Sequence, residues 1–259
     1  MAQKDRLESI QQTIQFEKKV TVSQLSKDLK VTEETIRRDL EKLEGEGVLT
    51  RIHGGAVLNA GQVSENIDYL MRERHNHLEK QIMGQLAASI IPNRATVGTD
   101  ASSTVMEAVR LLKNRPEITI LTNSVQIVRE LGQSALTIVS TGGIVNKSTF
   151  SMQGQVVRKI LSDYYVDIAL ISCKALDLEG GIFDSNEEEG ELKKLMAERG
   201  QKIILMADHT KFDRVAFVRI LDLERLDVLI TDQEPAPEWQ AVCREKGVKL
   251  LYPGADESR

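Results

Sequence analysis

The stretch from Thr32 to Leu40, T-E-E-T-I-R-R-D-L, constrains the fold more than any other part of the 259-residue chain. Thr32 is a favourable N-cap, and the two glutamates after it suit the positive end of a helix dipole. Ile36, Leu40 and Leu43 recur at i, i+4 and i+7, which predicts one buried stripe. A short amphipathic helix therefore begins at this point.

The outward face of this helix carries Thr35, Arg37 and Arg38. A capped helix that presents a hydroxyl and two guanidinium groups near its N-terminus suits the DNA major groove, because arginine pairs bidentately with guanine. Surface arginines on an amphipathic helix are more often only a solvated face. The residues around the helix decide between these two interpretations.

Two further elements precede this helix in the sequence. Apolar residues at helical spacing predict a supporting helix over 6–16. A second helix is predicted to begin at Thr21, with Gln24 as its capping-box partner, and to end before a tight turn at 30–31. Two short helices joined by such a turn, the second beginning at Thr32, form a helix-turn-helix.

A hairpin is predicted after the helix-turn-helix. Residues 48–51 and 56–58 have the pattern of two short strands on either side of His53-Gly54-Gly55, so the unit is a winged helix. Arg51 and His53 occupy positions where a wing would touch phosphate. The candidate DNA-contacting residues are Thr32, Thr35, Arg37, Arg38, Lys42, Arg51 and His53.

The charge of this region is balanced. Residues 1–58 contain ten Lys and Arg and ten Asp and Glu, and the whole chain has a formal net charge of −5. Bulk attraction to DNA is therefore weak, and binding needs a focused patch and several copies acting together. We expect a homo-oligomer, a dimer or a tetramer, on a repeated operator in double-stranded DNA.

The N-terminal pattern resembles the DeoR family of bacterial repressors of sugar metabolism. The resemblance implies that Asp39 braces the helix or its neighbours, and that the outward side chains of the helix face DNA. It rests on Arg6, Ile10, Ile14, the segment 32–40 and His53-Gly54-Gly55-Ala56.

The length predicts a second, larger domain with its own core. The expected boundaries are 1–58 for the winged helix, 59–64 (N-A-G-Q-V-S) for a linker and 65–259 for the second domain. No apolar run reaches the roughly 18 residues of a membrane helix, and the polar start is not a signal peptide, so a cytoplasmic protein with no membrane contact is expected. Cys173 and Cys243 lack the spacing of a disulfide framework or a zinc site.

The sequence of the second domain predicts an α/β fold. Short apolar runs alternate with helical patterns, which predicts a mostly parallel sheet that binds ligands at the carboxyl ends of its strands. The predicted strands are 95–98, 118–121, 136–140, 166–172, 202–207, 228–231 and 248–252. The predicted buried helix stripes are Ile82-Leu86-Ile90, Val105-Val109-Leu112 and Val156-Ile160.

Small polar residues follow three successive predicted strands. Where such residues begin a helix, the free backbone N–H groups and the helix dipole favour an anion, although the serines could simply cap the helix. Convergence of three such ends favours a phosphorylated, polyhydroxylated ligand, and two later lysines could supply positive charge. The candidate effector-binding residues are Asp100, Ser102, Ser103, Thr104, Thr122, Asn123, Ser124, Thr141, Gly142, Gly143, Lys174, Asp208 and Lys211.

The acidic segment 184–191 invites a metal-site interpretation. A helix cap is the better one: Ser185 or Asn186 begins a helix, its first turn holds the glutamates, and Lys193 and Lys194 pair with them at i, i+4. We expect neither a metal nor a cofactor.

The family resemblance extends through this second domain. It implies a fold similar to ribose-5-phosphate isomerase and a phosphorylated sugar or sugar alcohol as the effector that relieves repression. The first loop departs from the family pattern at Ala101-Ser102-Ser103-Thr104, which leaves the identity of the ligand open. We expect no catalytic residues. Two alternatives are an active sugar-phosphate isomerase fused to the helix-turn-helix, and a domain that only assembles the oligomer.

Overall fold

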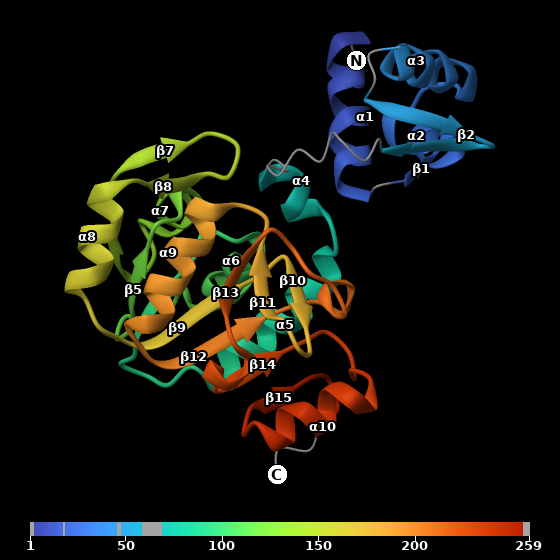
Figure 1. Cartoon of the computed structure of the whole chain (residues 1–259). Coiled ribbons are helices and arrows are strands. Elements are labelled where there is room, and N and C mark those ends of the chain that lie inside the picture. Colours follow the sequence, from blue (N-terminus) through green and yellow to red (C-terminus); the bar gives the residue numbers. More distant parts are fainter. Residues whose placement is uncertain (1–2, 18, 46–47, 59–68, 256–259) are drawn as a thin grey trace. The chain divides into compact units, whose positions relative to one another are not determined.

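The computed structural model describes residues 3–17, 19–45, 48–58 and 69–255. The chain divides into two compact units, Met1–Met71 and Arg72–Arg259 (Figure 1). The predicted linker at 59–64 lies outside the described residues. None of the helices in the described ranges is both long and apolar enough to cross a lipid bilayer.

The described residues between 3 and 58 of the first unit form three helices and a small antiparallel sheet of order β1-β3-β2. The first of these strands was not predicted, because its three residues carry too little pattern. The elements are α1 (Gln3–Glu17), β1 (Lys19–Thr21), α2 (Val22–Leu29), α3 (Glu33–Gly45), β2 (Leu49–Ile52) and β3 (Gly55–Leu58).

The helix that the sequence singled out has the predicted buried stripe. Ile36, Leu40 and Leu43 of α3 are fully buried and pack with Ile10 and Ile14 of α1. This small core holds α2 and α3 in a helix-turn-helix, and β2 and β3, which follow in sequence, form the predicted hairpin. The winged helix is confirmed.

The start of α2 follows only half of the predicted capping box. The Thr21 hydroxyl accepts a hydrogen bond from the Gln24 amide at 3.3 Å. The Gln24 side chain does not return to Thr21 but donates to the Asp28 carboxylate at 2.9 Å. The prediction of a reciprocal bond between the Gln24 side chain and Thr21 was therefore wrong.

The second unit is built on a seven-stranded parallel sheet, and all seven predicted strands are present. Its order is β15-β14-β12-β9-β4-β5-β6. The strands are β4 (Thr96–Thr99), β5 (Thr119–Thr122), β6 (Thr137–Ser140), β9 (Val166–Ser172), β12 (Gly200–Met206), β14 (Val228–Ile230) and β15 (Lys249–Leu251).

Five short strands outside this sheet were not predicted. They form a hairpin and a three-stranded antiparallel sheet of order β10-β11-β13. They are β7 (Ile144–Asn146), β8 (Ser151–Gln153), β10 (Ala175–Asp177), β11 (Gly181–Asp184) and β13 (Val218–Leu221).

Helices cover both faces of the large sheet, as Figure 1 shows. Alternation along β9 divides the core: Ile168 and Leu170 belong to one cluster, Ala169 and Ile171 to the other. The first cluster packs on α5 (His77–Ile90), α6 (Ser103–Leu112) and α7 (Val125–Leu131). The second packs on α8 (Gln155–Asp163), α9 (Glu187–Glu198) and α10 (Pro237–Glu245). The remaining elements are α4 (Tyr69–Arg74) and the 3-10 turns η1 (His209–Lys211) and η2 (Leu223–Arg225).

Two of the predicted helix stripes were partly wrong. Ile82 and Val156 are exposed, whereas Val157 and Leu161 are fully buried. The apolar pattern of each helix allows two neighbouring faces. Leu86, Ile90 and Ile160 of the predicted stripes are partly buried against the core. The Val105-Val109-Leu112 stripe is buried as predicted.

The strand order reverses at the centre of the sheet. From β4 the chain builds outward through β5 and β6, and then returns to place β9 on the opposite side of β4. The carboxyl ends of β4 and β9 therefore frame a topological switch point, the usual ligand crevice of an open parallel sheet.

Candidate DNA-binding and effector sites

The N-terminus of α3 is organised by two threonines. The Thr32 hydroxyl accepts a hydrogen bond from the Thr35 amide at 3.3 Å, and the two hydroxyl oxygens lie 2.9 Å apart. Thr32 is thus the predicted N-cap. The bond fixes the first turn of α3 and leaves its outer face open to a partner.

Both arginines on that face are held by glutamates one turn earlier. The Arg37 guanidinium lies 2.7 Å from the Glu33 carboxylate, and that of Arg38 lies 3.6 Å from Glu34. All four side chains are well exposed, so these pairs contribute little stability. A phosphate or a base edge can replace the glutamates as the arginines' partner.

The wing residue Arg51 is oriented in the same way. Its guanidinium lies 2.7 Å from Glu44, and its backbone N–H donates to the same carboxylate at 2.8 Å. These bonds lower the pKa of Glu44. Lys42 and His53 are exposed on α3 and in the β2–β3 turn. The predicted DNA-contacting residues thus all lie in α3, at its cap or in the hairpin.

Asp39 braces α3 against α1, as the resemblance implied. Its carboxylate is buried and accepts hydrogen bonds from the Arg6 guanidinium at 2.5 and 3.1 Å. The ion pair raises the pKa of Arg6 above its ordinary value. The orientation of the recognition helix is therefore fixed by a charge pair as well as by apolar packing.

Asp100 lies at the switch point, directly after β4. One carboxylate oxygen accepts the Ser172 amide at the end of β9 at 3.0 Å, and the other accepts the Ser102 amide at 3.0 Å. The Lys193 ammonium lies 3.2 Å away. Asp100 therefore joins the two central strands, and its hydrogen-bonding capacity is largely taken up by the protein.

Lys193 is a buried cation between two buried carboxylates. Its ammonium also donates to Asp184 at 2.7 Å and to the Ser172 carbonyl at 2.9 Å. Burial alone would lower the pKa of Lys193, but Asp184 and Asp100 outweigh it and raise it. Lys193 in turn holds the pKa of Asp184 below its ordinary value, against the effect of burial. The predicted pairing of Lys193 with the surface glutamates was wrong.

The acidic segment itself caps a helix, as predicted. The Asn186 side chain accepts the Glu189 amide at 3.0 Å, and Glu187, Glu188 and Glu189 occupy the first turn of α9. Within the described ranges, no three His, Cys, Asp or Glu side chains are grouped as a metal site would require.

The predicted hydroxyl residues after β4 and β5 are buried, and two of them cap helices. Ser102 accepts the Val105 amide at 3.1 Å, and Ser124 accepts the Ile127 amide at 3.2 Å. Thr122 accepts the Ser124 amide at 3.0 Å. Ser103 and Thr104 lie in the buried first turn of α6. Capping thus accounts for the side-chain oxygens of Ser102 and Ser124, while α6 and α7 still begin at this edge of the sheet.

The third predicted cluster follows β6. Gly143 has φ 112°, and a Cβ there would lie 2.7 Å from both the Gln153 carbonyl oxygen and Val157, so only glycine fits. Gly142 also has positive φ, and Thr141 before it is buried.

Asn123 has unused hydrogen-bonding capacity. It donates to the Met152 carbonyl at 3.2 Å, while its buried Oδ1 has no partner among the described residues. A buried amide oxygen without a partner is uncommon and is satisfied by a ligand or a water in many proteins.

Basic side chains that act on one another electrostatically lie beside these loops. Lys174 follows β9, Lys211 lies in η1, and the segment 72–80 adds Arg72, His75 and Lys80. We call these five residues the cation cluster. Burial, followed by the charges of Arg72 and Lys211, lowers the pKa of Lys174 well below its ordinary value.

The pKa values of two members of the cluster from the 72–80 segment, His75 and Lys80, are lowered in the same way. Burial and then the charges of Lys211 and Lys80 lower the pKa of His75 to about 4. Burial and then Lys211 lower the pKa of Lys80 to about 8. Positive charge is thus held together in a partly desolvated region, which is the condition that an anionic ligand relieves.

Asp208 connects η1 to the same segment. Its carboxylate accepts hydrogen bonds from the Thr210 amide and from Asn76 Nδ2, each at 3.1 Å. Burial alone would raise the pKa of Asp208, but the Lys211 charge and these bonds outweigh it and lower it. Asp208 is therefore an ionised partner of the cation cluster.

Sequence reasoning missed Arg72, His75 and Lys80, and it placed Asp184 and Lys193 in a capped helix without their mutual ion pair. Arg72 lies on α4, His75 between α4 and α5, and Lys80 on α5. All three precede β4, so no rule about strand ends pointed to them. Asp184 and Lys193 are nine residues apart, and their pairing depends on β11 and α9 packing together. The one available signal was the density of basic residues over 72–80.

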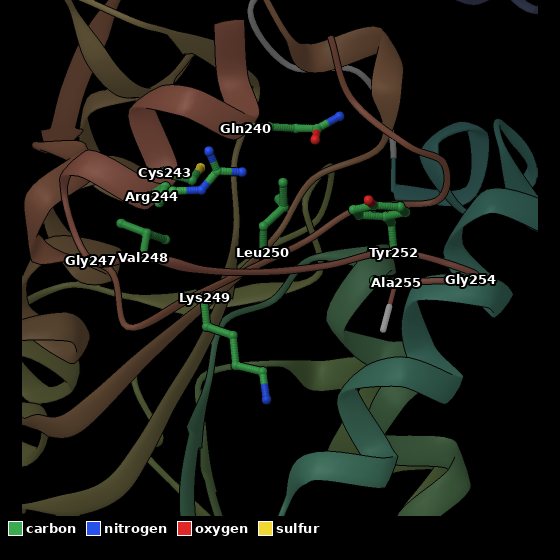
Figure 2. Close-up of a pocket in the computed structure, with 10 residues that line it drawn as sticks. All are labelled: Gln240, Cys243, Arg244, Gly247, Val248, Lys249, Leu250, Tyr252, Gly254 and Ala255. Carbon is green, nitrogen blue, oxygen red and sulfur yellow. The ribbon is translucent and has the colours of Figure 1, made fainter. Parts of the chain in front are cut away.

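A hollow of about 590 Å³ lies elsewhere, beside α10 and β15 (Figure 2). Gln240 and Arg244 come from the helix, while Lys249 points away from them on the other side of the strand. None of its ten lining residues belongs to the cation cluster or to the predicted effector set. The hollow is therefore not part of the candidate effector site.

Models of known families match both units. The DeoR-like helix-turn-helix domain matches residues 6–62, and the DeoR C terminal sensor domain matches residues 75–233. The chain is a member of the DeoR family of transcriptional regulators. The resemblance seen in the sequence is thereby confirmed, and the C-terminal unit is a sensor domain.

Relatives of this DeoR-family chain match it over almost its full length. The HTH-type transcriptional regulator YulB of Bacillus subtilis is 37% identical, with 95% of each chain covered. The HTH-type transcriptional repressor GlcR of the same species is 34% identical, with 100% of each covered. The L-fucose operon activator of Haemophilus influenzae is 29% identical, covering 95% of this chain and 98% of that one.

Among solved structures, a ribose 5-phosphate isomerase from Methanocaldococcus jannaschii is similar at a TM-score of 0.40 and 15% identity. The match covers 53% of this chain and 55% of the isomerase.

Proposed function

We propose that this DeoR-family regulator represses a carbohydrate-utilisation operon in the cytoplasm, and that a phosphorylated sugar or sugar alcohol relieves the repression. The observation that carries the proposal is the cation cluster beside the switch point. Lys174 and Lys211 would bind the phosphate, and the unpartnered Asn123 oxygen would accept from a ligand hydroxyl. The relatives named as a transcriptional repressor and as an operon activator support a role in regulation.

The operator would be contacted by α3 and by the wing. Arg37 and Arg38 would exchange their glutamate partners for base edges or phosphates. The winged helix has balanced charge, so we expect two or four copies to bind together on half-sites about one helical turn, or a multiple of it, apart.

The isomerase alternative needs a carboxylate that is free to take a proton. Asp100, at the switch point, and Asp184, at the end of β11, are buried carboxylates that both lie within ion-pair distance of the Lys193 ammonium. A low pKa makes Asp184 a weak base. These contacts support a sensor that binds its ligand without converting it.

The test is a thermal unfolding series on the full-length protein with a panel of sugars and sugar alcohols, each with and without phosphate. A ligand at 100 times its dissociation constant adds about 2.7 kcal/mol, which moves the midpoint visibly. A shift with phosphorylated members only is the expected result. A shift with unphosphorylated members only would contradict the phosphate site, and no shift would favour a domain that only assembles the oligomer.

A matched pair of variants locates the site. Lys211→Gln removes a cation-cluster charge, and Lys202→Gln removes an exposed charge near the amino end of β12, whose carboxyl end leads to Asp208. Only Lys211→Gln should reduce the ligand-induced shift.

A further inference from the structure

Three sets of contacts hold the segment 72–80: one lies within it, and two join it to its surroundings. The buried Lys80 ammonium donates to the Arg72 carbonyl and, at 2.6 Å, to that of His75, so it caps the end of α4. Glu73 lies 2.8 Å from Arg110 of α6. Asn76 Nδ2 donates to Asp208 at 3.1 Å and to the Thr210 hydroxyl at 3.3 Å. The segment is therefore an ordered part of the sensor domain.

The third set of contacts joins this segment to the candidate effector site. Asp208 also interacts with Lys211, and the charges of Lys211 and Lys174 act on His75. A ligand anion placed among Lys174 and Lys211 would therefore change the forces on His75, Asn76 and Arg72 directly. Arg72 is the first residue of the sensor unit, and the chain before it leads to the winged helix.

We propose that residues 72–80 complete the effector site and pass its occupancy to the DNA-binding domain, with Arg72 and His75 facing a phosphomonoester dianion and Asn76 as the coupling contact. This inference rests on the proposed function. A dianion suits the site because Asp208 offsets only part of the positive charge of the cluster. The ligand would draw Arg72 and His75 inward and alter the strength of the Asn76–Asp208 bond, which changes the end of α4 where the chain leaves the sensor.

Asn76 offers a clean substitution. Its φ of 49° lies in the left-handed region, where glycine is at least as comfortable as asparagine. Asn76→Gly therefore keeps the backbone and removes the two side-chain hydrogen bonds. His75→Gln and His77→Gln form a second pair: the charges of Lys211 and Lys80 act on the partly buried His75, whereas His77 is exposed and contacts Gln81.

The experiment uses the full-length protein and a duplex that it selects from a random-sequence pool. Operator affinity is measured with and without ribose 5-phosphate, glucose 6-phosphate, fructose 1-phosphate and inorganic phosphate, and binding of each probe is measured separately by calorimetry. For wild type we expect at least one phosphomonoester to change operator affinity by about 5–150-fold.

Asn76→Gly should bind that probe and the duplex, yet lose most of the change in operator affinity. His75→Gln should weaken probe binding by about threefold or more, and His77→Gln should behave as wild type. A wild-type response in Asn76→Gly would overturn the coupling role while leaving the proposed function intact. If wild type bound none of the phosphate-bearing probes, the proposed function and this inference would both be overturned.

Discussion

Arg6 and Asp39 join the supporting helix to the recognition helix through a buried pair, with the guanidinium Nη2 3.1 Å and Nε 2.5 Å from the carboxylate oxygens. Asp39→Asn would leave the Arg6 charge without its counterion in a small core. We expect the winged helix to lose about 3 kcal/mol, near the lower end for a broken buried pair because Arg6 keeps some exposure.

Asp28→Asn is the control for this variant. Asp28 is an exposed carboxylate of the same domain that accepts from Gln24, and its loss should change stability by less than about 0.5 kcal/mol. Denaturant unfolding of the two variants measures the difference. Equal stabilities would show that the Arg6–Asp39 pair does not hold α3.

Arg37 gives the second prediction. If it reads a base, Arg37→Ala should cost about 1–3 kcal/mol in operator binding and relax sequence preference at one position. Glu33→Gln should act in the opposite direction, because it removes the carboxylate that lies 2.7 Å from Arg37 and competes with DNA. Fluorescence anisotropy at several salt concentrations measures both.

Arg225→Ala, an exposed arginine in the sensor domain, serves as the control for bulk charge. An Arg37→Ala protein with unchanged operator affinity and salt dependence would remove Arg37 from the contact set.

Lys193 and Lys194 are neighbours with opposite environments. Lys193→Met would leave Asp100 and Asp184 without their buried cation, which should destabilise the sensor domain by about 3–5 kcal/mol. Lys194→Met, on the exposed side of α9, should change it by about 0.5 kcal/mol or less. Adding Asp184→Asn to Lys193→Met should recover part of the loss. Thermal unfolding of the three proteins checks this, and equal effects of the two lysine variants would contradict it.

The sequence predicted the large sheet well because a strand buried on both faces must be a continuous apolar run. Val166–Ser172 of β9 shows this, since its predicted and observed bounds coincide. Short strands at the rim, such as Ala175–Asp177 of β10, carry no such run and were missed. In α8 the pattern fits two faces, so Val156 was chosen where Val157 is buried.

The candidate site was predicted only in part for a similar reason. The carboxyl end of a strand can be recognised from the neighbouring sequence, so Asp100 and Lys174 were predicted as site residues. The identity of the partners of Asp100 depends on tertiary packing, and Lys193 reaches it from α9. His75 belongs to the cation cluster but comes from a segment that precedes the whole sheet in sequence. No local rule links such residues before the fold is known.

His75 gives a prediction about pH. Burial, followed by the positive charges of Lys211, Lys80 and Lys174 and opposed by Asp208, lowers its pKa from 6.5 to about 4. Between these two values the unfolded chain binds more protons than the folded one, so wild-type stability should fall as pH drops from 6.5 to 4. His75→Gln lacks this proton uptake, so its stability relative to wild type should rise as the pH drops through the same window. The exposed His77→Gln should not show this rise. Urea unfolding at intervals across that range measures the three proteins. A constant difference between wild type and His75→Gln would mean that His75 titrates normally and lies outside the field of the cation cluster.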